Sequence, residues 1–135
     1  MEHLIIEVER DDDGVWRIRF HVEAGPFIGD GSCWGAPESL DEFATALGGH
    51  PLRNVATLTF GYGELPNKDV RLQLTIRPIG AVGRLEARVE IADDHDPSCR
   101  LTTKLGTTYA SLDRFASELR GMVRGNGDQA RLVSG

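Results

Sequence analysis

The chain has 135 residues, and its 40% hydrophobic and 27% charged residues are typical of one soluble globular domain spanning residues 1–135. The formal net charge is −6 and the isoelectric point is about 5.1, which argues against nonspecific binding to nucleic acid or anionic membranes, because both need a cationic surface. No stretch approaches the roughly 18 apolar residues of a membrane span, and the first residues lack the pattern of a signal peptide, so we expect a cytoplasmic protein with no membrane partner.

Three strands are predicted ahead of the first helix. The apolar residues of segment 4–9 indicate a strand, and an acidic turn at 11–14 separates it from segment 15–23. Segment 15–23 alternates between apolar and polar residues, which is typical of a half-buried antiparallel strand in a hairpin. Segment 27–34 is expected to form a third strand, weakened by its glycines. The residues expected on the apolar face of the second strand are Trp16, Ile18, Phe20 and Val22.

An amphipathic helix is predicted over residues 39–47, where apolar residues recur at i, i+3, i+4 and i+7. Ser39 is expected to be its N-cap, and Glu42, three residues later, completes a capping box. Pro37 prevents the preceding strand from continuing into the helix. The pair Gly48-Gly49 is expected to end it.

Further strands and a second helix are predicted after residue 55. The strands are expected at 56–62, 70–77, 84–91 and 99–105, and the helix from a cap near Ser111 to Leu119. In the first of these strands the alternation assigns four residues to one apolar face, namely Ala56, Leu58, Phe60 and Tyr62.

Two segments of the chain repeat each other. Residues 39–49 and 111–121 are identical at seven of eleven positions, and residues 56–61 resemble residues 130–135. Such a repeat predicts two related halves in one core, each with the order strand–strand–strand–helix–strand. The last residues of the chain would then form a short strand. The two halves would span residues 3–62 and 70–135.

These elements predict an α+β domain with a mostly antiparallel sheet of about seven to eight strands and two amphipathic helices on one face. The opposite face would be polar and rich in arginine, a residue favoured at protein–protein surfaces. The same pattern is also typical of a solvated face with cross-strand ion pairs, each worth about 0.2–1 kcal/mol. The residues that form the candidate partner surface are Arg17, Arg19, His21, Arg71, Arg77, Glu86, Arg88 and Glu90.

No pattern in the sequence predicts a catalytic, metal or cofactor site. The acidic segment 93–96 with Cys99 matches no metal-site spacing and is expected to be a solvated turn. No two of the histidines have the i, i+4 spacing of a helical zinc site, and His21 is expected to be an exposed cross-strand partner for a carboxylate. Cys33 and Cys99 are expected to be buried free thiols rather than a disulfide.

The layout resembles a group of small bacterial α+β proteins of undefined function, some of which are similar to the WapI-type immunity proteins. The residues that carry the resemblance are the pair Cys33-Trp34 before the first helix and the Leu-x-x-Phe-Ala-x-x-Leu pattern of both helices, at 40–47 and 112–119. These are expected core residues, so no functional residue carries over. What the resemblance implies is an immunity function.

The leading hypothesis is a non-enzymatic protein-interaction module, of the immunity or antitoxin type, that binds a protein partner through its sheet face or an acidic edge. A homodimer formed through an edge strand or the polar face is also expected. The alternative is a small-molecule binding domain or small enzyme with a pocket between the helices and the sheet. The aromatic residues that would line such a pocket are Trp16, Phe27, Trp34 and Tyr62.

Overall fold

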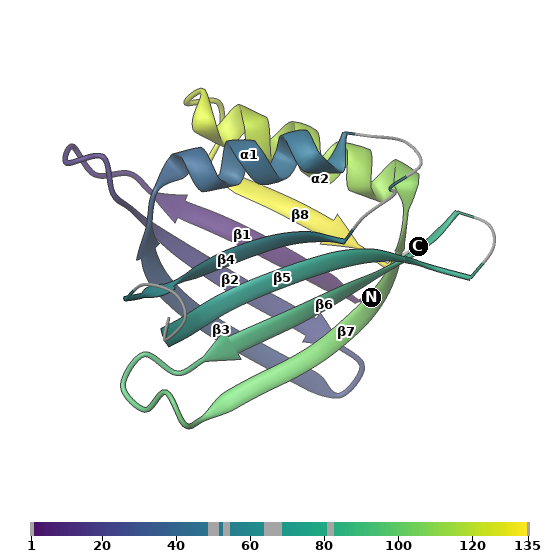
Figure 1. The fold of residues 1–135 in the computed structure, drawn as a ribbon, viewed down its shortest axis with the longest axis horizontal. Helices are drawn as coiled ribbons and strands as arrows, with labels where there is room; N and C mark the ends of the chain where they lie inside the picture. Colours follow the sequence, from purple (N-terminus) through teal and green to yellow (C-terminus); the bar gives the residue numbers. More distant parts are fainter. Residues whose placement is uncertain (1, 49–51, 53–54, 64–68, 81–82, 135) are drawn as a thin grey trace.

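The computed structural model of the chain describes residues 2–48, 52, 55–63, 69–80 and 83–134. Eight strands and two helices follow one another in these ranges (Figure 1). In chain order they are β1 (His3–Glu9), β2 (Trp16–Ala24), β3 (Phe27–Gly35), α1 (Pro37–Leu47), β4 (Ala56–Tyr62), β5 (Asp69–Ile79), β6 (Arg84–Ala92), β7 (Arg100–Thr108), α2 (Tyr109–Val123) and β8 (Gln129–Val133). Neither helix in the described ranges has the length and apolar character needed to cross a membrane.

The predicted α+β class is confirmed, but the strands form two antiparallel sheets instead of one. Sheet A has the order β3-β2-β1-β8, and sheet B has the order β4-β5-β6-β7. The predicted C-terminal strand is confirmed as β8, which pairs antiparallel with β1 and brings the two ends of the chain together (Figure 1). A single sheet would have presented one polar face, whereas two sheets present two.

The order of elements repeats along the chain. The first five elements run β1-β2-β3-α1-β4 and the last five run β5-β6-β7-α2-β8. Each sheet combines three consecutive strands of one half with the last strand of the other half, so β8 joins sheet A and β4 joins sheet B. A common origin of the two halves stays a prediction.

Both helices begin earlier than predicted, and their caps differ from those expected. Helix α1 starts at Pro37, its N-cap is Ala36, and no side chain caps it, so the capping box of Ser39 and Glu42 is wrong. Proline is favoured in the first turn because its fixed φ suits a helix and its missing N–H would be unpaired there. Helix α2 has Thr108 as its N-cap, whose hydroxyl oxygen accepts from the backbone N–H of Ser111 at 3.3 Å.

Strand β3 lies against the inner face of sheet B and carries very little side-chain volume on that side. Its inward positions are Gly29, Gly31, Cys33 and Gly35. A Cβ atom at Gly31 would overlap the Cγ2 methyl of Ile91 in β6, and one at Gly35 would overlap the ring of Phe60 in β4. These glycines lower the strand propensity of the segment, but they allow the two sheets to approach each other.

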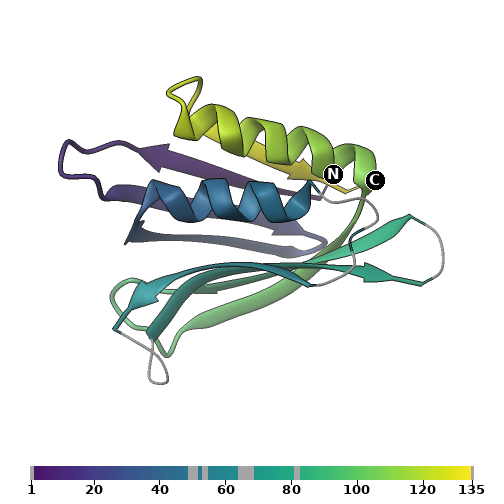
Figure 2. The ribbon, with the colours of Figure 1, turned by 45° about the horizontal axis from the view of Figure 1, so that its top comes forward.

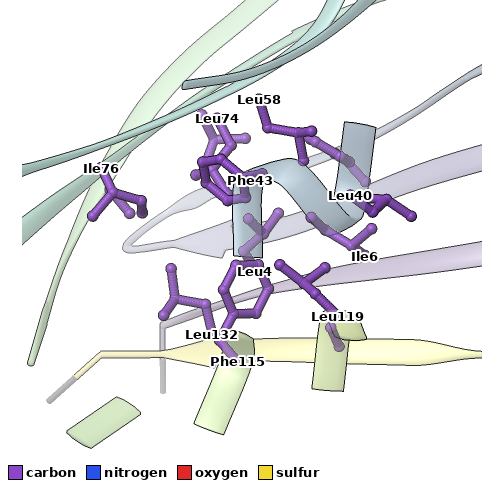
Figure 3. Packing of buried hydrophobic residues seen from close by; sticks show 14 of the residues in the cluster. Leu4, Ile6, Leu40, Phe43, Leu58, Leu74, Ile76, Phe115, Leu119 and Leu132 are labelled. Carbon is purple, nitrogen blue, oxygen red and sulfur yellow. The ribbon is translucent and has the colours of Figure 1, made fainter. Parts of the chain in front are cut away.

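On the other side, the two helices close the space between the sheets. They lie side by side, α2 next to β8 and α1 next to β4 (Figures 1 and 2). Arg120 in α2 joins them by donating from Nη2 to the carbonyl oxygen of Ala44 at 3.1 Å. Figure 3 shows the apolar side chains from both sheets and both helices meeting in one cluster, with Phe43 and Phe115 inside it.

Removing either of these two aromatic rings tests the helix packing. Phe43 is 3% exposed and Phe115 is fully buried, so we expect Phe43→Ala and Phe115→Ala each to lower the free energy of unfolding by about 3–5 kcal/mol. Urea unfolding followed by circular dichroism measures the change. The exposed neighbour Glu42 provides a control, since Glu42→Ala should change stability by no more than about 0.5 kcal/mol. An equally small effect for either phenylalanine would contradict the packing described here.

Adding one methyl group to β3 tests the close approach of the sheets. We expect Gly31→Ala to destabilise the fold by about 1–3 kcal/mol, because the new Cβ atom would overlap Ile91. Gly106 is the matched control: it also lies within a strand, β7, but a Cβ atom there meets nothing within 4 Å. Equal unfolding free energies for Gly31→Ala and Gly106→Ala would show that the sheets are not in contact along β3.

Candidate functional site

The outer face of sheet A carries a polar groove of about 560 Å³, which we call the sheet A groove. Its floor is formed by β1, β2 and β3, and the segment after β6 forms part of its rim. The residues that line it are Ile5, Glu7, Arg17, Arg19, Phe20, His21, Asp30, Gly31, Ser32, Asp93 and Asp94.

The pleat of β2 explains why polar side chains gather there. Ile18, Phe20 and Val22 are buried in the core, so the residues between them must face the opposite side. Strand pairing then aligns these polar residues with neighbours: His21 lies opposite Asp30, and Arg19 lies opposite Ser32. The alternation seen in the sequence therefore explains the polar side of β2, and strand pairing adds the rest of the groove floor.

Two histidines and two carboxylates form a connected cluster beside this groove. Nδ1 of His21 lies 2.7 Å from Oδ1 of Asp30, and its Nε2 lies 4.0 Å from Oε2 of Glu23. Nε2 of His3 lies 2.9 Å from the same oxygen of Glu23. The two imidazole rings are 6.0 Å apart, centroid to centroid. Both histidines therefore direct a ring nitrogen at one carboxylate.

The two arginines of the groove have no carboxylate partner among the described residues. Arg17 donates from Nη2 to the hydroxyl of Ser32 at 3.0 Å, while its Nε is buried and has no hydrogen-bond partner there. Arg19 is exposed and makes no side-chain hydrogen bond or ion pair with any described residue. Neither guanidinium group is therefore engaged in a direct ion pair with a described residue.

The acidic groups lining the groove, in contrast, each have a hydrogen-bond or ion-pair partner. Asp30 binds His21, and Asp93 accepts from the backbone N–H of Asp96 at 2.8 Å. Asp94 lies 3.7 Å from Nη1 of Arg71. The side chain of Glu7 accepts from the amide of Gln129 in β8. Glu7 and Asp93 keep their negative charge, because the amide groups that donate to them are neutral. The donors that these contacts leave unused in the groove are the guanidinium of Arg19 and the buried Nε of Arg17.

The predicted partner surface is divided between two faces. Arg17, Arg19 and His21 lie in the sheet A groove. The other five predicted residues lie on strands β5 and β6 of sheet B, namely Arg71, Arg77, Glu86, Arg88 and Glu90. Most of these have ion-pair partners on sheet B. The pairs are Arg77–Glu86 at 3.0 Å, Arg71–Asp69 at 2.9 Å and Arg100–Glu90 at 3.9 Å.

The aromatic residues expected in a pocket between helices and sheet lie elsewhere. Phe27, Trp34 and Tyr62 are 56%, 45% and 40% exposed, and Trp16 is partly buried against the core. Tyr62 leaves the apolar face predicted for β4 because the register between β4 and β5 shifts at Phe60 and Gly61. Such a bulge changes which face the following residues present. The space between helices and sheets is filled by the apolar cluster instead.

The two cysteines are both free, but only Cys33 is buried as predicted. Burial raises the pKa of the Cys33 thiol, which suits an inert core residue. Cys99 is exposed, which corrects the expectation, because it precedes β7 in a turn rather than lying in the strand. Its thiol donates to Oδ2 of Asp96 at 3.5 Å, and this carboxylate raises the pKa of Cys99.

Sequence reasoning missed His3, Glu23 and Asp30 as members of a site. The alternation of the predicted strand placed His21 and Glu23 on one polar face, but it gave no reason to treat them as a site. His3 and Asp30 had no such signal, because their proximity depends on the register of β1 and β3 against β2.

No protein-family model matches the chain, and searches of the curated proteins and of the solved structures found no significant match.

The different environments of the two cysteines predict different reactivity. We expect the folded protein to expose one reactive thiol, Cys99, to a reagent such as DTNB, and the denatured protein to expose two. Cys99→Ser should remove the reaction of the folded protein. Asp96→Asn should lower the Cys99 pKa towards its ordinary value and speed the reaction at neutral pH, because the thiolate loses a neighbouring negative charge. Rapid labelling of Cys33 in the folded state would contradict its burial.

Proposed function

We propose that the protein is a non-enzymatic protein-interaction module that binds a protein partner in the sheet A groove, where Arg17 and Arg19 receive a carboxylate of that partner. The observation that carries this proposal is that both arginines of one groove lack an acidic partner among the described residues. On sheet B, Arg71, Arg77 and Arg100 each have such a partner, and Arg88, which has none there, lies outside the groove.

The buried Nε of Arg17 also supports a carboxylate as the group that binds in the groove. A buried donor without a hydrogen bond costs about 1–3 kcal/mol, and a ligand oxygen that reaches it would remove this cost. Planar guanidinium groups are well suited to carboxylates, because two parallel N–H donors match the two oxygens. Arg17 is held in place by Ser32 and therefore loses little freedom when a partner binds.

Exposed apolar residues along β3 support a protein rather than a small anion as the ligand. Trp34 lies opposite Arg17 in the strand register and is 45% exposed. Ile28, on the same strand, is 64% exposed. Tryptophan and arginine are the residues most often found at the energetic centre of protein interfaces. Strand β3 thus offers apolar contact beside the two groove arginines.

The immunity or antitoxin role and the cytoplasmic location belong to this proposal. They are supported by the layout resemblance described above and by two cysteines that are both free, as is usual where disulfides do not form. The alternative function, a small-molecule pocket between helices and sheet, has less support, because the described residues of the interior form a continuous apolar cluster. The hollows of about 310 Å³ between α2 and β8 and about 340 Å³ between α1 and β4 are lined mostly by exposed or partly exposed residues.

A charge reversal in the groove tests the proposal. Proteins captured from host extract on the wild-type chain are identified, and a candidate partner is produced and titrated by calorimetry. We expect Arg19→Glu to weaken binding of the purified partner about tenfold or more, since the carboxylate it meets would be repelled. Trp34→Ala should also weaken binding.

Arg88 is the matched control for Arg19. It is also an exposed arginine within a strand with no ion pair to a described residue, but it lies on sheet B. Arg88→Glu changes the net charge equally and should leave affinity within about twofold. Equal affinity of the wild type and Arg19→Glu for the partner would refute binding in the sheet A groove. Sedimentation of the pure chain at twice 14.8 kDa, reversed by Arg19→Glu, would identify a second copy as the occupant and overturn a foreign partner.

A further inference from the structure

We propose that His3, His21 and Glu23 form a binding site for a divalent transition-metal ion such as Zn²⁺ on the outer face of sheet A. One ligand atom from each of these residues can be chosen so that all three lie within 4.8 Å of one another. Two imidazoles and one carboxylate are a common ligand set for zinc, and imidazole also suits copper, iron and nickel. The inference does not depend on the proposed protein partner.

The distances between the donor atoms suit a metal ion with little rearrangement. Zinc binds nitrogen and oxygen at about 2.0–2.2 Å, which places two tetrahedral ligand atoms about 3.4 Å apart. Oε2 of Glu23 lies 2.9 Å from Nε2 of His3 and 4.0 Å from Nε2 of His21. These two distances fall on either side of the required value, so small side-chain rotations are sufficient. The ion would replace the hydrogen that His3 donates to Glu23.

Asp30 orients His21 for this role. A carboxylate can only accept hydrogen bonds, so the 2.7 Å contact means that Nδ1 of His21 carries the hydrogen and donates it. In the neutral imidazole the other ring nitrogen, Nε2, then carries the lone pair that a metal ion needs, and this is the atom that faces Glu23. A carboxylate behind a metal-binding histidine is the usual arrangement in zinc sites. Asp30 is therefore a positioning residue.

Backbone pairing fixes all the participating residues. His3 on β1 lies directly opposite Glu23 on β2, and His21 lies two residues before Glu23 on the same face. Asp30 on β3 lies directly opposite His21. The side chains of His3, His21 and Glu23 are 16%, 34% and 38% exposed, so an ion can reach the site from solvent. Three protein ligands leave a coordination position free for water or another ligand.

Zinc binding to the untagged chain tests this site directly, because a histidine tag would supply competing imidazoles. We expect calorimetry with Zn²⁺ to give one ion per chain, and metal analysis after dialysis to agree. His21→Ala and Glu23→Ala should lose the bound ion. Asp30→Asn should weaken the affinity about 10- to 100-fold while leaving the melting temperature of the metal-free protein unchanged, as a positioning role requires.

Two variants serve as controls, and circular dichroism verifies that each protein is folded. His95 and Cys99 are exposed and lie in or beside the acidic turn after β6, which contains other metal-ligand types. His95→Ala and Cys99→Ser should bind Zn²⁺ like the wild type. Absence of stoichiometric binding, retention of the ion by folded His21→Ala, or its loss in Cys99→Ser would each overturn the proposal.

Discussion

Sheet A and sheet B can approach each other only because the inward face of β3 carries almost no side-chain volume. Three glycines and Cys33 occupy the positions that would otherwise hold large apolar residues, and the side chains of sheet B fill the space directly. On the opposite side the helices supply the missing volume, with Phe43 and Phe115 inside the core. The backbone of β3 therefore packs against sheet B on one side of the molecule, and helix side chains fill the space between the sheets on the other side. Because protein interiors are close-packed, neither side tolerates added or missing side-chain volume.

The same constraint determines what the outer face of sheet A presents. With the small residues of β3 turned inward, the alternate residues Asp30, Ser32 and Trp34 face solvent beside the polar residues of β2. Sheet B differs in that several of its outward charges pair with one another across strands, as Arg77 does with Glu86. Such exposed ion pairs contribute little to stability. The charged groups in them already have a partner within the protein. On sheet A, Arg17 and Arg19 lie in one groove and have no ion-pair partner among the described residues.

Strand register, rather than sequence proximity, assembles the chemistry of this face. His3 and Glu23 are separated by a hairpin, yet pairing of β1 with β2 places them side by side. The proposed metal ligands lie on β1 and β2, and the groove arginines lie on β2, so one sheet supports both. Residues carried by neighbouring strands keep their relative positions better than residues carried by loops, which favours binding without rearrangement.

The sequence by itself determined the type and order of the elements, the apolar stripes of both helices and the polar face of β2. These features depend on periodicity, which is local and strong in segments such as Trp16–Ala24. The helix caps at Ala36 and Thr108 were missed, because competing local signals stood nearby at Ser39 and Ser111. Only the tertiary structure decided that the eight strands form two sheets and that β4 and β8 each join the sheet of the other half. It also decided that His3 lies next to Glu23. Those outcomes depend on pairing between residues far apart in the chain, and no local pattern specifies which strand edges will meet.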